Sequence, residues 1–160
     1  MTDPTDPTDR TDPADLTDAI RTVIRLARIA QQALDEVGLS LPQYRALNAV
    51  VRGPQRAFEL ARYSAVSRPA MSALTTGLER QGWIEREASP ADRRGVSFVA
   101  TDAGREQFAR AEELLRGRFG TVLGDATVAL QALDTDALEA ALDQQAEQDF
   151  PTTDPTPEAP

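Results

Sequence analysis

The sequence predicts a mainly α-helical fold that carries one small β-hairpin. Three observations support this prediction. Two short segments with helical spacing of apolar residues meet at a tight turn around Val66 and Ser67. After Gly82 the pattern changes to the alternation typical of a strand, and Thr101 then begins a long helical segment. A helix, a turn, a second helix and a two-stranded wing, in this order, indicate a winged helix-turn-helix domain over residues 40–104.

The second helix of this motif is predicted over residues 68–80. Ser67 is its expected N-cap, because a serine hydroxyl there accepts from the free N–H groups of the first helical turn. Met71, Leu74 and Leu78 follow helical spacing, so one face is expected to lie in the core. The opposite face has small or polar side chains over which another molecule could approach closely. These residues are Pro69, Ser72, Ala73, Thr76 and Arg80.

The wing is predicted as two strands, at residues 83–87 and 96–100, joined by a tip at residues 89–95. A short third strand beside them is expected near residues 56–58. Thr101 follows the second strand as a plausible N-cap for the long helix, since its hydroxyl resembles that of serine.

The first predicted helix covers residues 15–37 and ends at Gly38, a typical residue after a helix C-terminus. Its apolar residues form one stripe. They are Leu16, Ile20, Val23, Ile24, Ala27, Ala30 and Leu34. Leu26 and Ile29 lie off this stripe, so the helix is expected to pack against a second neighbour as well, for which a partner subunit is a natural candidate.

The second predicted helix begins after its N-cap Ser40 and stops at Gly53. Tyr44 within it is interpreted as a core residue with its hydroxyl at the surface; contact with a ligand is the alternative. The start of the next helix is poorly signalled, because Ala57 and Phe58 stand where a serine, threonine or aspartate is expected.

The long helix from Thr101 is predicted to continue as far as Leu130. Three glycines indicate a bend, a close helix crossing or local fraying, since each weakens a helix by up to about 1 kcal/mol relative to alanine. They are Gly117, Gly120 and Gly124. Charged residues are expected to form a solvated face. They are Glu106, Arg110, Glu112, Glu113, Arg116 and Arg118.

A final helix is predicted after a cap at residues 134–136, ending at Phe150. The chain is thus expected to form one domain over residues 15–150. Within it, the segments 15–38 and 105–150 flank the winged helix-turn-helix. Residues 1–14, with repeated Thr-Asp-Pro, and residues 151–160, rich in proline, are predicted to be disordered tails.

The net charge of −9 would argue against a nucleic-acid partner if it were spread evenly. Residues 1–20 hold six acids and one Arg, and residues 125–160 hold nine acids and no base. Residues 45–105 instead hold ten Arg and six acids, a net charge of +4. The centre is therefore suited to phosphate contact, while the acidic N-terminal tail is interpreted either as a solubilising end or as a competitor for the basic surface.

The chain contains no Cys and no His. These absences exclude a disulfide, a Cys/His metal site, a Ser-His-Asp group and an imidazole pH sensor. No constellation of acid, base and nucleophile suggests an enzyme, and no cofactor is expected. Without a signal peptide or a long apolar run, a soluble cytoplasmic protein with no membrane partner is expected.

Several segments of the chain, in order and spacing, follow the pattern of one known family. They are Leu41-Pro42-Gln43-Tyr44-Arg45-Ala46-Leu47, Glu59-Leu60-Ala61, Val66-Ser67, Leu78-Glu79-Arg80-Gln81-Gly82-Trp83-Ile84, Asp92-Arg93-Arg94 and Thr101-Asp102-Ala103-Gly104. Through them, residues 16 to about 148 resemble the MarR (multiple antibiotic resistance regulator) family of bacterial transcription factors. The resemblance implies a homodimer joined by its first and last helices, so that the segments 15–38 and 105–150 are the dimerisation helices. Such a dimer binds palindromic operators and is often released by a small ligand, here of unknown identity.

The resemblance also implies that Arg94 enters the minor groove of DNA and that Asp92 holds it, with Arg93 able to reach a phosphate. A narrow minor groove concentrates negative potential, so an arginine there reads groove width. The alternative is that Asp92 and Arg94 form a surface ion pair that only stabilises the hairpin tip. In the second helix of the motif, over residues 68–80 and here called the recognition helix, Arg68 contacts either a base or a phosphate.

The sequence is therefore interpreted as a double-stranded DNA-binding transcriptional regulator, a ligand-responsive repressor that acts as a homodimer. A winged-helix module for protein–protein contact is the alternative. Small side chains in the recognition helix favour methyl contacts to thymine over a dense polar readout. The predicted DNA-contacting residues are Ser67, Arg68, Pro69, Ala70, Ser72, Ala73, Thr76, Asp92, Arg93 and Arg94.

Overall fold

The computed structural model describes most of the predicted domain. The described residues are 13–64, 66–88, 96–135, 137, 138, 140–142 and 144. The predictions for the wing tip, for nearly all of both tails and for the end of the final helix lie outside them.

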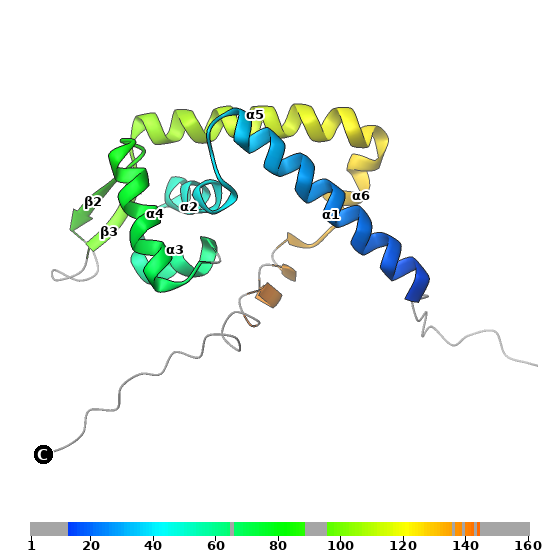
Figure 1. The fold of residues 1–160 in the computed structure, drawn as a ribbon, viewed down its shortest axis with the longest axis horizontal. Coiled ribbons are helices and arrows are strands. Elements are labelled where there is room, and N and C mark those ends of the chain that lie inside the picture. Colours follow the sequence, from blue (N-terminus) through cyan, green and yellow to red (C-terminus); the bar gives the residue numbers. More distant parts are fainter. Residues whose placement is uncertain are drawn as a thin grey trace, which may run out of the picture.

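A winged lobe sits at one end of a long helix, and the C-terminal part of the first helix packs against that helix while its N-terminal part diverges from it (Figure 1). The long helix is α5 (Asp102–Leu123), and the first is α1 (Pro13–Glu36). The lobe consists of α2 (Leu41–Arg52), α3 (Ala57–Ser64), α4 (Arg68–Arg80) and a small sheet. The mainly helical winged helix-turn-helix fold is therefore confirmed. None of the described helices is both long enough and apolar enough to cross a membrane.

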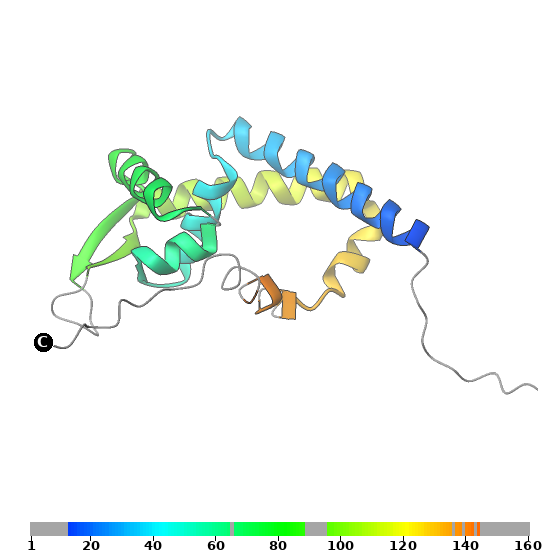
Figure 2. The same cartoon turned by 60° about the horizontal axis from the view of Figure 1, so that its bottom comes forward.

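Helix α1 buries the C-terminal end of the predicted stripe, at Leu34, together with residues that lie off the stripe. In Figures 1 and 2 the C-terminal part of α1 lies near α5. The buried residues of α1 are Ala33 and Leu34, and Leu26 and Ile29 are partly buried. The N-terminal part of the predicted stripe is exposed. Its exposed large side chains are Leu16, Ile20, Val23 and Ile24. The helix also begins at Pro13, two residues early, because proline is accepted in a first turn.

The start of α2 is held by reciprocal hydrogen bonds. The Gln43 backbone N–H donates to Ser40 Oγ at 3.4 Å, and the Ser40 backbone N–H donates to Gln43 Oε1 at 2.8 Å. The N-cap prediction for Ser40 is confirmed, and Gln43 completes a capping box. Leu47 and Val50 of this helix lie at the centre of the lobe's core.

The two helices of the motif begin without the expected serine hydroxyl. Glu59 caps α3 instead, because its carboxylate accepts from the Arg56 backbone N–H at 2.6 Å. Ser67 stands at the N-cap position of α4, but its side chain makes no capping hydrogen bond, so that prediction was wrong. Pro69 in the first turn has no N–H to donate, which removes one of the two donors that an N-cap hydroxyl ordinarily reaches.

The sheet has three antiparallel strands in the order β1-β3-β2. They are β1 (Gln55–Arg56), β2 (Ile84–Ala88) and β3 (Val96–Ala100). The predicted third strand is confirmed, one residue earlier than expected. Strands β2 and β3 pair from Ile84 opposite Ala100 to Ala88 opposite Val96. The described strands therefore end at Ala88 and Val96, where the wing tip begins.

Helix α5 begins at the predicted cap, where Thr101 Oγ1 accepts from the Gly104 backbone N–H at 3.1 Å. It ends at Leu123 and not at Leu130, because Gly124 has a φ of 49° and breaks the helical path. A 3₁₀ turn, η1 (Gly124–Ala126), and a short helix, α6 (Thr127–Gln131), follow.

The final helix starts as predicted. Asp134 Oδ1 accepts from the Ala137 backbone N–H at 2.9 Å, and the described residues that follow are helical. Those residues are 135, 137, 138, 140–142 and 144. The predicted end at Phe150 lies outside the described part of the chain.

Candidate nucleic-acid interface

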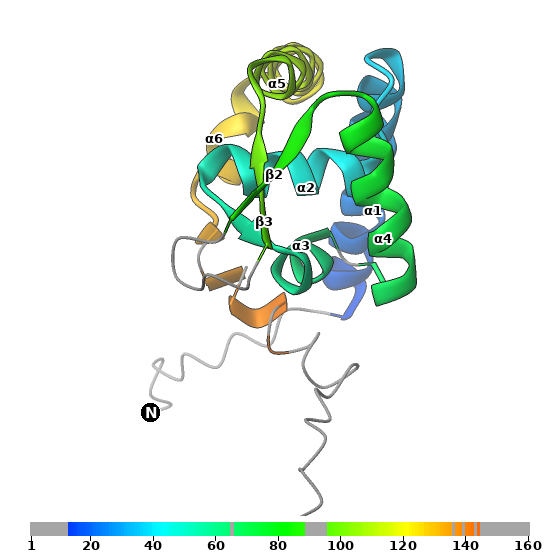
Figure 3. The ribbon, with the colours of Figure 1, turned by 90° about the vertical axis from the view of Figure 1, so that its left-hand side faces the viewer.

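Helix α4 lies along one side of the winged lobe (Figure 3). Its inner face is buried, with Met71 3% exposed and Leu78 0% exposed. The outer face is open to solvent, and Ser67 just before it is exposed as well. The exposed residues of this face are Pro69, Ala70, Ser72, Ala73, Thr76 and Arg80. The predicted division of the helix into a core face and a small-residue outer face is therefore confirmed.

Four predicted contact residues cannot be placed in the same way. Arg68 is the first residue of α4, but its side chain is outside the description. Asp92, Arg93 and Arg94 belong to the undescribed segment 89–95. Their roles stay predictions from the sequence.

Arg86 connects the wing to α4, the recognition helix, and was not predicted from the sequence. Its guanidinium donates to both carboxylate oxygens of Glu79, at 2.6 and 3.0 Å, and lies 5.4 Å from the centre of the Phe98 ring. Glu79 belongs to α4, whereas Arg86 and Phe98 face each other across β2 and β3. A bidentate pair fixes orientation as well as distance. Only the strand register could have revealed Arg86, because alternation alone does not give its cross-strand partner.

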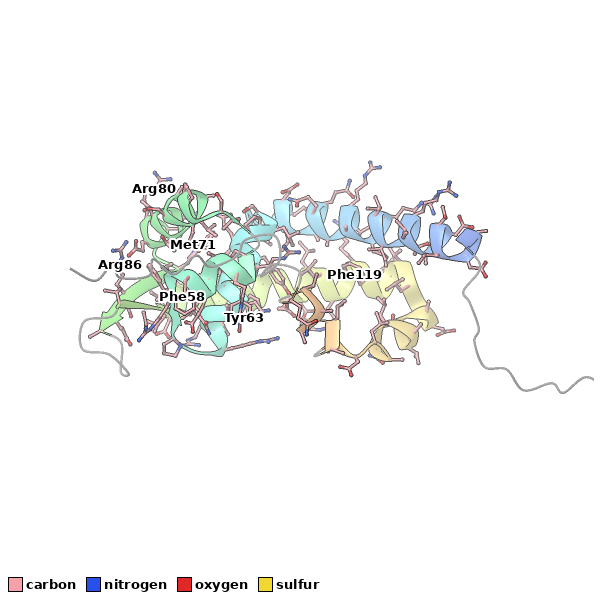
Figure 4. All side chains as sticks on the ribbon, turned by 90° about the horizontal axis from the view of Figure 1, so that it is seen from below. Phe58, Tyr63, Met71, Arg80, Arg86 and Phe119 are labelled. Atoms are coloured by element: carbon pink, nitrogen blue, oxygen red, sulfur yellow. The ribbon has the colours of Figure 1, made fainter. Side chains whose placement is uncertain are left out.

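Arg80 and Arg86 lie at the same end of the lobe, one on α4 and the other on the wing (Figure 4). Between α3, α4 and the wing strands is a groove of about 420 Å³. Its lining includes Phe58, Met71, Ser72, Thr75, Arg86 and Phe98. The groove thus opens beside Ser72, on the exposed face of α4, and two cations lie close to the predicted DNA-contacting surface.

A polar contact joins the lobe to the long helix. The Tyr44 hydroxyl of α2 donates to the Glu112 carboxylate of α5, and the Tyr44 ring stacks on Phe108 with 5.5 Å between ring centres. Glu112 is therefore not part of the solvated face predicted for it. Tyr44 does pack against the core, but its hydroxyl is bonded to Glu112. Nearby, Gln107 donates to the Val37 carbonyl at 2.6 Å and so connects α5 to the end of α1.

We expect Tyr44→Phe to lower the free energy of unfolding by about 1–2 kcal/mol. The substitution keeps the ring stacking but leaves a half-buried carboxylate without its donor. Urea unfolding followed by circular dichroism measures the change. The double variant with Glu112→Gln is the control: it should recover part of the loss, because an amide is less costly to leave unpaired than a carboxylate. An unaltered unfolding free energy in Tyr44→Phe would show that the hydrogen bond does not stabilise the protein.

The same contact predicts that the stability contributed by the Tyr44 hydroxyl decreases at alkaline pH. Burial, followed by the hydrogen bond to Glu112, raises the pKa of Tyr44 above its ordinary value of 10. Because the folded state keeps the proton more tightly, this stabilisation is fully present below pH 10 and is lost as the pH rises further. The difference in stability between the wild type and Tyr44→Phe should therefore narrow above pH 10.

The comparisons with known proteins place this fold. A model of the MarR family matches residues 37–95. The HTH-type transcriptional repressor Rv2887 of Mycobacterium tuberculosis is 33% identical over 100 residues, which cover 62% of this chain and 72% of the repressor. The chain belongs to the MarR family.

Solved MarR-family structures agree with this assignment. Rv2887 in complex with salicylic acid is 29% identical with a TM-score of 0.59, over 83% of this chain and 98% of that one. The transcriptional repressor CouR bound to a 23-mer DNA duplex is 28% identical with a TM-score of 0.57, over 80% of this chain and 89% of that one. The winged lobe is thus that of a MarR-family regulator of transcription.

Proposed function

We propose that this MarR-family protein is a homodimeric transcriptional repressor that binds a palindromic operator in double-stranded DNA and responds to a small ligand. In the proposed complex α4 enters the major groove and the wing tip reaches the adjacent minor groove.

The exposed face of α4 carries this proposal. Among the described side chains of α4, the apolar residues are buried on one side, and the exposed face carries small residues and Arg80, so this face can approach base edges closely without steric conflict. The DNA-bound state of the similar repressor CouR supports the same use of the fold. On α4, Ser72 and Thr76 are the proposed polar contacts, and Ala70 and Ala73 the proposed methyl contacts to thymine.

Unpartnered apolar surface supports the dimer. Ile20, Val23 and Ile24 of α1 are each more than half exposed. An apolar groove of about 760 Å³ also runs beside the second half of α5, lined by residues that include Leu114, Gly117 and Val122. Such surface is costly to leave in water. We assign it to contact with a second copy of the chain, with α1 and the final helix forming the base of the dimer.

A ligand would bind near the junction of the lobe and the dimer helices. Tyr44 and Phe108 provide stacked aromatic rings there. The similar Rv2887 binds salicylic acid, which supports a small ligand here. Since the chain has no Lys and no His, an anionic ligand would have to be held by arginine, hydroxyl or backbone donors.

Salt dependence tests whether DNA is the partner. We expect operator affinity to fall by a factor on the order of 1000 between 50 and 200 mM salt, because arginine–phosphate contacts release bound counterions. Fluorescence anisotropy with a labelled duplex measures the slope. A random duplex of equal length is the control, and it should bind more weakly at every salt concentration. Failure to bind any duplex, together with salt-insensitive binding to a protein partner, would favour a protein–protein module.

Selection of bound sequences from a random DNA pool tests the symmetry. A dimer with two equivalent α4 helices should enrich inverted repeats with half-sites about 10 base pairs apart from centre to centre. Enrichment of single, asymmetric sites would contradict the proposed dimer.

A further inference from the structure

The end of the recognition helix is built into the turn that follows it. The Gly82 backbone N–H donates to the Glu79 carbonyl at 2.9 Å, and the Trp83 N–H donates to the Leu78 carbonyl at 3.0 Å. These two bonds form a Schellman motif, in which Gly82 has a φ of 72°. The direction of the Gly82–Trp83 turn is therefore fixed by α4.

Thr101, the N-cap residue of α5, is hydrogen-bonded to the Gly82–Trp83 turn. The Thr101 backbone N–H donates to the Trp83 carbonyl at 3.1 Å, and Thr101 Oγ1 donates to the Gly82 carbonyl at 2.5 Å. The Thr101 hydroxyl also accepts from the Gly104 N–H at 3.1 Å. One hydroxyl thus caps α5 and connects it to the end of the recognition helix.

At Gly104 the first turn of α5 lies directly against the Gly82–Trp83 turn, and this contact is called the joint below. A Cβ atom at this position would lie 2.0 Å from the Trp83 carbonyl oxygen and 2.8 Å from the carbonyl carbon. Both are backbone atoms, so no rotamer change could relieve the clash. By contrast, a Cβ at Gly117 or Gly120 would meet nothing within 4 Å in the protomer. Gly104 is inside a helix, where glycine is unfavourable by about 1 kcal/mol relative to alanine, and this close approach explains why glycine is needed.

The angle at this joint sets the direction in which α4 extends from α5. Helix α4 has 13 residues and is therefore about 20 Å long. A rotation of about 10° at the joint, which lies at the C-terminal end of α4, moves the N-terminal end of α4 by roughly 3 Å, and in a symmetric dimer the partner's helix moves by the same amount. One base pair of DNA is about 3.4 Å long. A small change at the joint therefore alters the separation of the two recognition helices by a distance comparable with one to two base pairs.

We infer that Thr101 and Gly104 are positioning residues that hold α4 at a fixed angle to α5 and thereby set the separation of the two recognition helices on the operator. This inference rests on the proposed function, because it requires a dimer joined away from the lobes. Neither residue is assigned a contact with DNA. Substitution of either residue should therefore change the preference for a particular half-site spacing, in addition to any change in operator affinity.

Binding to a panel of operators tests the inference. The panel keeps one inverted repeat and changes the half-site spacing by one or two base pairs in each direction. We expect the wild type to prefer its best spacing over its neighbours by roughly tenfold. Thr101→Val, which keeps the shape of the side chain but removes the hydroxyl, and Gly104→Ala should each shift the optimum or reduce this preference to about twofold or less. Thr101→Ser, which keeps the hydroxyl, should behave like the wild type.

Val50→Ala is the matched control, since Val50 is 2% exposed in the lobe's core and is not part of the joint. It should lower the melting temperature and leave the spacing preference unchanged. If Thr101→Val and Gly104→Ala keep the wild-type optimum, or lose affinity equally at all spacings, the positioning role is wrong. If Gly104→Ala does not fold, Thr101→Val decides. A wild type that shows no preferred spacing would instead refute the proposed dimeric operator complex.

Discussion

Arg94→Ala should weaken operator binding at least tenfold and leave the melting temperature nearly unchanged. Arg94 is proposed to insert into the minor groove, where the negative potential is strongest when the groove is narrow. A tenfold loss corresponds to about 1.4 kcal/mol of binding free energy. The paired strands β2 and β3 end at Ala88 and Val96, so the wing is expected to keep its base in this variant. Anisotropy titration and thermal unfolding measure the two quantities on the same samples.

Two comparisons separate this role from a general effect of charge. Arg116→Ala removes an equal charge from the exposed surface of α5, where Arg116 pairs with Glu113, and should change operator affinity less than twofold. Replacing A·T pairs by G·C pairs opposite the wing should weaken the wild type but not the Arg94 variant, because the groove widens. If Arg94→Ala binds the operator with the affinity of the wild type, Asp92 and Arg94 only stabilise the hairpin tip through a surface ion pair.

Local patterns predicted the elements of the lobe closely. Helix α4 has the predicted bounds, because its apolar spacing lies between two clear breaks, at Val66-Ser67 and at Gln81-Gly82. The pairing of β2 with β3 was expected from the alternating pattern of the two segments that flank the wing tip. The Thr101 hydroxyl was also expected to cap α5, and it does.

Contacts between elements were harder to predict. Periodicity shows which α1 residues are apolar, but not which of two neighbours each one faces. In the protomer Leu34, at the end of the predicted stripe, is buried beside Ala33, whereas the large side chains of the stripe's N-terminal part are exposed. Gly104 gave no local signal, because a glycine inside a helix reveals its neighbour only once Trp83 has been placed beside it. The cap from Glu59 was missed because it comes from the third residue of α3 and not from the N-cap itself.

Ile24→Asp should convert the protein into a monomer and reduce operator affinity on the order of 100-fold or more. Ile24 is 65% exposed in the protomer, so the substitution should not disturb its core. In the proposed dimer, each Ile24 side chain would contribute about 2–3 kcal/mol of buried apolar surface. A twofold-symmetric interface contains the change twice, and burying two unpaired carboxylates adds a further cost. A monomer would bind a single half-site without the benefit of the linked second one.

Sedimentation velocity and operator titration test this prediction together. Gln32→Asp introduces the same charge at an exposed position of α1 outside the apolar stripe, and should remain dimeric with operator affinity close to that of the wild type. The fluorescence of Trp83, the single tryptophan of the chain, reports whether the lobe stays folded, since it packs against the core. A dimeric Ile24→Asp protein would place the subunit contact elsewhere than on this face of α1. A folded monomer that still binds the full operator tightly would separate DNA binding from dimerisation.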